Sequence, residues 1–85
     1  AWENLARKLA HEIKNPLTPI QLSAERLQKK LSGHLKESEE SILLKSTQMI
    51  VSQVSALKAM IDEFQNYARL PTAQPMNFFL FIYYI

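Results

Sequence analysis

The sequence contains no cysteine and only one glycine in its 85 residues. The missing cysteines exclude a disulfide scaffold, a zinc site built on thiolates and a cysteine nucleophile. The scarcity of glycine argues against turn-rich β sandwiches and against glycine-rich loops that cradle phosphate groups. We therefore expect a mostly helical chain.

Charge and long hydrophobic runs are also limited. The formal net charge is +2 at pH 7, too small to support binding by electrostatics alone, so we expect no nucleic-acid partner. The first twelve residues lack the apolar segment of a secretory signal. The longest apolar run, around residues 78–84, is far shorter than the ~20 residues that cross a bilayer as a helix. We expect the chain to lie in the cytoplasm, which leaves open that a larger parent protein is anchored in a membrane.

Apolar or small residues recur in alternating steps of three and four along two stretches. The first series is Ala10, Ile13, Leu17, Ile20, Ala24, Leu27 and Leu31. The second series is Leu43, Thr47, Ile50, Val54, Leu57, Ile61, Phe64 and Ala68. This spacing is the a/d pattern of helices that pack along one stripe. It predicts one helix over about residues 2–31 and another over about 38–69.

The connection between the two predicted helices, residues 32–37, is short. Gly33 suits the left-handed backbone that often ends a helix. Ser38, followed by two glutamates, suits the N-cap of the second helix. A connection of this length predicts an antiparallel hairpin. His34 falls in this loop, and we expect it to be an ordinary loop residue.

Both helices carry apolar residues beside the a/d pattern. These are Leu5, Leu9, Leu44, Val51, Met60 and Tyr67. A two-helix hairpin buries one stripe per helix, which is too little for a stable monomer. Pairing two hairpins buries both the a/d residues and the apolar residues beside them. The expected fold class is therefore all-α: an antiparallel two-helix hairpin over residues 1–70 that dimerises into a four-helix bundle. The alternative is a hairpin taken from a larger helical protein.

Residues 71–85 have a different character. Proline disfavours helical backbone in the residue before it, so Pro71 ends the second helix, and PTAQP predicts an extended linker. The final segment MNFFLFIYYI is uncharged and β-prone, but a strand needs a sheet that this chain does not supply. We interpret residues 71–85 as a linker and the truncated or altered start of a further domain. A weaker alternative makes the tail a membrane or partner anchor.

The candidate chemistry lies in AHEIKNPLTPI, residues 10–20. His11 falls beside the a/d pattern and is expected to be exposed, with Asn15 on the same face. Pro16 and Pro19 stand inside the first helix, where each costs about 3 kcal/mol. The apolar pattern continues across both, which predicts a kink and not a helix end. Residues that break the local rules of helix formation without a structural gain, as these two prolines do, tend to mark functional sites.

Two common chemistries do not fit this stretch. His11 and Glu12 do not complete an HExxH zinc motif, because Asn15 stands where the second histidine is required. A serine hydrolase needs an oxyanion hole, which a glycine-poor hairpin does not readily supply. An exposed imidazole can instead act as a nucleophile that accepts a group and passes it on. Glu12 is placed to orient the ring through one nitrogen.

The run HEIKNPL, residues 11–17, resembles the H-box in the dimerisation and histidine-phosphotransfer (HisKA-type) domain of sensor histidine kinases. LARKLAHEIKNPLTPIQLSAERL and IDEFQNYARLP resemble nitrogen-regulation kinases of the NtrY type, so the resemblance covers roughly residues 1–75. It implies that His11 receives the γ-phosphoryl group of ATP and gives it to a response-regulator aspartate. It further implies that Glu12 assists transfer as acid or base, that Asn15 positions water for dephosphorylation of the regulator, and that Pro16 lets the helix bend.

The resemblance also implies partners. They are a second copy of the chain, the ATP-binding domain of the parent kinase, and a regulator receiver domain, which we expect to dock on Thr18, Leu22 and Ser23. The sequence has no nucleotide-binding boxes, so we expect no cofactor here. ATP and Mg²⁺ would bind the missing domain, and this chain would be inactive alone, in the cytoplasmic portion of a membrane-anchored kinase.

The alternative function is a purely structural helical homodimer without chemistry. Two helix-breaking prolines in the middle of the a/d pattern argue against it, because a structural coiled coil has no use for them.

Overall fold

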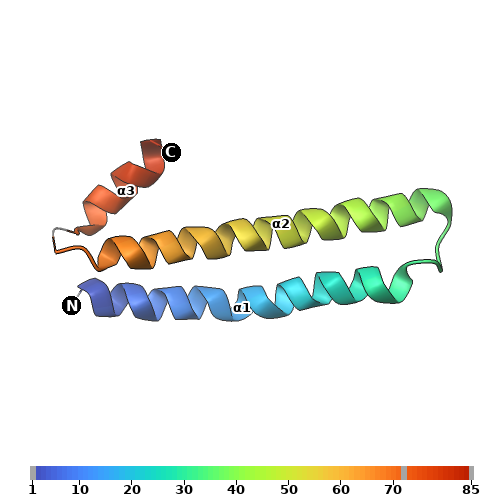
Figure 1. Ribbon diagram of the computed structural model, residues 1–85, viewed down its shortest axis with the longest axis horizontal. Coiled ribbons are helices and arrows are strands. Elements are labelled where there is room, and N and C mark those ends of the chain that lie inside the picture. The colour runs from blue at the N-terminus through green and yellow to red at the C-terminus, as the bar shows by residue number, and fades with distance from the viewer. Residues whose placement is uncertain (1, 72, 85) are drawn as a thin grey trace.

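The computed structural model of the protein describes residues 2–71 and 73–84, without the side chains of residues 81 and 82. Three helices follow in chain order: α1 (Trp2–Leu31), α2 (Glu37–Ala68) and α3 (Pro75–Tyr84). Helices α1 and α2 run antiparallel, and α3 folds back from the end of α2 on the side away from α1 (Figure 1). The predicted all-α hairpin is confirmed, with helix ends within one residue of those predicted from the sequence.

Alternate members of the a/d pattern form the contact between α1 and α2. The buried members recur every seven residues: Ala10, Leu17 and Ala24 on α1, and Thr47, Val54, Ile61 and Ala68 on α2. Most intervening members stay between 38% and 50% exposed, namely Ile13, Ile20, Leu27, Ile50 and Leu57, whereas Phe64 is half-buried. One hairpin therefore buries half of the pattern and leaves the other half open to solvent.

Polar contacts link α1 to α2 at three levels. The Thr47 hydroxyl donates to the side-chain oxygen of Gln28 at 3.0 Å, and the Lys58 ammonium donates to that of Gln21 at 3.0 Å. Nearer the N-terminus of α1, Lys14 forms an ion pair with Asp62. Each pair joins residues far apart in the sequence, so together they favour one register of the hairpin.

The connection at residues 32–36 confirms one prediction and corrects another. Gly33 has a φ of +83°, as expected of a helix-ending glycine. Ser38 is not the N-cap, because α2 begins at Glu37 with Lys36 as the cap residue. The Lys36 amide donates to the Glu39 carboxylate at 3.3 Å, and Glu40 accepts from the amide of Leu35 at 3.2 Å. These carboxylates reach back over the loop and hold its amides, which places Ser38 inside the first turn.

Helix α1 continues through Pro16 and Pro19, as the apolar pattern predicted. Each proline removes one backbone donor and crowds the carbonyl four residues earlier. Both prolines lie on the exposed surface of α1, where water can bond to the freed carbonyls. The kink at these positions stays a prediction.

The local conformation of the tail differs from what its composition suggested. Residues 75–84 form helix α3 and not a strand, because a helix pairs its own backbone groups whereas a lone strand leaves them unpaired. Pro75 suits the first helical position, where its missing amide proton would have had no partner. The linker is turned and not extended, since the Ala73 amide bonds to the Leu70 carbonyl at 3.1 Å. Thr72 lies outside the described residues.

Phe78 anchors α3 on the end of α2. Its ring centroid lies 4.7 Å from that of Phe64 and 5.5 Å from that of Tyr67. The Tyr67 hydroxyl donates to the Gln74 carbonyl at 3.0 Å and accepts from the Gln74 amide at 3.3 Å. Over the residues that the structure describes, no helix has both the length and the apolar character needed to cross a membrane.

Candidate functional site

His11 lies on a polar stripe of α1 that faces away from the hairpin contact. Asn15, Thr18 and Leu22 follow it at steps of four, three and four residues, which places all four on one helix face. All four are exposed, and Leu22 retains 60% of its surface. The structure therefore brings these predicted site residues together on an open face of α1, where a second protein could reach them.

The imidazole of His11 lies on the exposed surface of α1. Among the residues described, neither of its ring nitrogens has a hydrogen-bond partner in the chain. Glu12 is exposed, and as the next residue on the helix it projects about 100° away around the axis. The role of Glu12 in orienting the ring stays a prediction. His34 differs, because its Nδ1 lies 3.1 Å from the Ser32 carbonyl oxygen in the loop.

Lys14 connects this stripe to α2, and sequence analysis did not select it. It stands three residues after His11, so the two side chains are neighbours on the helix surface. Its ammonium pairs with the carboxylate of Asp62, and the two side chains are 32% and 58% exposed, respectively. The spacing from His11 was visible in the sequence. Its partner, 48 residues further along the chain, is brought there only by the hairpin.

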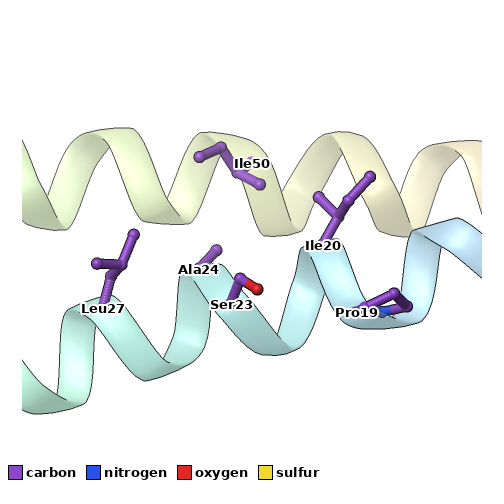
Figure 2. Close-up of a pocket in the computed structure, with 6 residues that line it drawn as sticks. All are labelled: Pro19, Ile20, Ser23, Ala24, Leu27 and Ile50. Atoms are coloured by element: carbon purple, nitrogen blue, oxygen red, sulfur yellow. The ribbon is translucent and has the colours of Figure 1, made fainter.

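Pro19 and Ser23 lie on a different face of α1 from Leu22. They line an apolar groove with Ile20, Ala24 and Leu27 of α1 and Ile50 of α2 (Figure 2). Three of the exposed a/d residues, Ile20, Leu27 and Ile50, line this groove. Ser23 is thus separated from Thr18 and Leu22, with which it was expected to form one docking surface.

Comparison with known proteins gives a consistent result. A family model described as His Kinase A (phospho-acceptor) domain matches residues 1–73, a segment that ends before α3. Nitrogen regulation protein NtrY of Azorhizobium caulinodans is 52% identical over 71 residues, which cover 84% of this chain and 9% of that protein. A putative sensor histidine kinase NtrY-like of Rickettsia felis is 49% identical over 71 residues, 84% of this chain and 12% of that protein.

The relative in Rickettsia bellii, also named putative sensor histidine kinase NtrY-like, is 46% identical over 77 residues. These cover 91% of this chain and 12% of that protein. The chain therefore spans only about a tenth of the length of the curated relatives it matches. No solved structure matches the chain significantly.

Proposed function

Since this chain belongs to the His Kinase A (phospho-acceptor) family and matches NtrY-type sensor kinases over most of its length, we propose that His11 is the residue that accepts the phosphoryl group. The observation that carries this proposal is the open imidazole of His11 on an exposed stripe of α1. The other histidine, His34, lies in the connecting loop against the Ser32 carbonyl.

In the proposed reaction, an unprotonated ring nitrogen of His11 attacks the γ-phosphorus of ATP. The N–P bond forms as the bond to the bridging oxygen breaks and ADP leaves, and the proton on the other ring nitrogen passes to Glu12. In the second step a carboxylate oxygen of a response-regulator aspartate attacks the same phosphorus, the N–P bond breaks, and the proton on Glu12 returns to the ring, which leaves as neutral imidazole. ATP and Mg²⁺ would be bound by an ATP-binding domain elsewhere in the parent kinase.

The other residues of the stripe would serve the regulator. Thr18 and Leu22 offer a methyl group and an exposed aliphatic side chain about two and three turns beyond His11. The Asn15 amide would hold the water that hydrolyses the regulator's aspartyl phosphate, because it stands one helical turn from the transferring group. Pro16 would let α1 bend there, since it removes a backbone hydrogen bond next to the site.

The apolar groove supports a second copy of the chain as partner. Half of the a/d pattern remains exposed in the hairpin, and a parallel arrangement of two hairpins as a four-helix bundle would cover it. The working protein would then be a homodimer. It would form the cytoplasmic portion of a membrane-anchored kinase. That residues 71–85 lead into a further domain stays a prediction.

The test uses the full-length parent kinase, with its ATP-binding domain, incubated with γ-labelled ATP beside its His11→Gln and His34→Gln variants. We expect acid-labile, base-stable label on the parent and on His34→Gln, and none on His11→Gln. Label on His11→Gln, or label that survives acid, would contradict the proposal. Absence of label from all three, with ATP binding intact, would favour the structural homodimer.

A further inference from the structure

We propose that Lys14 holds the phosphoryl group on His11 and that Asp62 of α2 competes for Lys14, so that phosphorylation breaks the ion pair between the two helices. This inference rests on the proposed role of His11. It starts from the Lys14–Asp62 pair, the link between α1 and α2 that lies nearest to His11 in the sequence.

The geometry of α1 places Lys14 within reach of His11. Residues three apart on a helix have Cβ atoms about 5–6 Å apart. Helical side chains lean toward the N-terminus of their helix. The long side chain of Lys14 therefore leans back over the turn that carries His11, and a phosphoryl group on the ring would lie beside its ammonium.

Charge decides which partner Lys14 takes. A phosphoryl group on a side chain adds a charge of about −1.5 to −2 and three acceptor oxygens, whereas Asp62 offers a single negative charge. The existing pair is partly exposed, with Asp62 at 58%, and exposed ion pairs are weak. Exchanging Asp62 for the phosphoryl group therefore costs little, and the new partner is the stronger one.

The exchange would change the contact between α1 and α2 at one end only. The other polar links, Lys58 with Gln21 and Thr47 with Gln28, lie further toward the connecting loop and do not involve Lys14. Loss of the Lys14–Asp62 pair would remove the polar link between α1 and α2 next to Pro16, where α1 already lacks a backbone hydrogen bond. Phosphorylation of His11 would thus change the contact between α1 and α2.

Lys8 is the natural control, because it stands three residues before His11 and carries the same charge. Its side chain leans toward the N-terminus and so away from the His11 turn. Lys8 and Lys14 therefore differ in direction along the helix and not in charge or spacing. Removing Lys8 should leave the phosphoryl group undisturbed.

The experiment uses the 85-residue chain with potassium phosphoramidate, a small phosphoryl donor that modifies exposed imidazoles without an enzyme. The initial rate of His11 phosphorylation is followed by mass spectrometry, and circular dichroism verifies that each variant is helical. We expect Lys14→Gln to lower the rate by about twofold to fivefold, the scale of one exposed charge pair. Lys14→Arg should restore it, and Lys8→Gln should match the parent chain.

The direction in which Asp62→Asn changes the phosphorylation rate decides between the two interpretations of the ion pair. This substitution frees Lys14, so we expect a faster rate than in the parent chain, and high salt should reduce all of these differences. A purely structural ion pair predicts that Lys14→Gln and Asp62→Asn change the rate in the same direction or not at all, and either result would overturn the inference. An equal loss in Lys8→Gln would also overturn it, by indicating a general basic field.

The two proposals fail separately. If His11→Gln is phosphorylated as fast as the parent chain, the role of His11 is wrong whatever the Lys14 variants do. If His11 alone takes the phosphoryl group but the Lys14 and Asp62 variants do not shift in opposite directions, only the assignment of Lys14 falls.

Discussion

Trp2 at the start of α1 packs edge-on against Phe64 near the end of α2, with ring centroids 5.5 Å apart and ring planes at 75°. Phe64 also meets Phe78 of α3. The hairpin is thus joined at one end by the connecting loop and at the other by aromatic side chains from all three helices. Because edge-to-face pairs add to the burial of the rings themselves, this cluster should contribute measurably to stability.

The Phe64→Ala substitution tests the cluster. It removes the ring that touches both Trp2 and Phe78, and we expect a loss of about 2 kcal/mol in the free energy of unfolding, below the value for a fully buried phenylalanine because Phe64 is half-buried. Urea unfolding followed by circular dichroism measures the loss. Phe79→Ala is the matched control, since Phe79 is 66% exposed and its loss should have little effect.

Gly33→Ala tests the connecting loop. Gly33 has a φ of +83°, and a Cβ added there would meet no atom within 4 Å. The expected cost of about 1–2 kcal/mol therefore comes from the left-handed backbone alone. Thermal unfolding should show a lower midpoint for Gly33→Ala than for Ser32→Ala in the same turn. Equal midpoints would mean that the loop readily adopts another conformation.

Thr47→Val tests the polar contact buried between the helices. Thr47 is 2% exposed, and its hydroxyl donates to Gln28 and lies 2.8 Å from the Leu43 carbonyl oxygen. Valine keeps the shape but leaves the Gln28 oxygen without this donor, so we expect a loss of about 1 kcal/mol. A double-mutant cycle with Gln28→Ala should show coupling between the two residues, and additive effects would contradict the contact.

Ile20→Glu tests the apolar groove as the surface that meets a second copy. A carboxylate in this groove would be desolvated in the bundle. We therefore expect the dissociation constant of the dimer, measured by analytical ultracentrifugation, to rise by at least tenfold. Leu22→Glu places the same charge on the same helix but on the His11 stripe. The dimer should survive in that variant, and dissociation in both would place the interface elsewhere.

Leu22→Glu is also informative about the regulator. If the stripe of His11, Thr18 and Leu22 docks the receiver domain, phosphoryl transfer from His11 to the regulator should slow by about tenfold, the effect of losing one good interface contact. Phosphorylation of His11 itself should be unchanged. Transfer at the parent rate would exclude Leu22 from the docking surface.

Local composition was misleading at two places for related reasons. Ser38 has the right residue type for an N-cap, but the carboxylates of Glu39 and Glu40 reach back to the loop amides and start α2 one residue earlier. Residues 75–84 have the composition of a strand, but no second strand is present to pair with them, and Phe78 finds an aromatic surface on α2 as part of a helix. In both cases specific contacts made by side chains outweighed local propensity.

The sequence by itself determined the two long helices, their antiparallel connection at Gly33 and the exposed face that carries His11, because each depends on spacing or backbone geometry within a few residues. The tertiary structure alone decided which half of the a/d pattern is buried, that α3 packs on Phe64 and Tyr67, and that Lys14 meets Asp62. These relationships join residues far apart in the chain. They depend on the register at which the two helices pack, which no local pattern specifies.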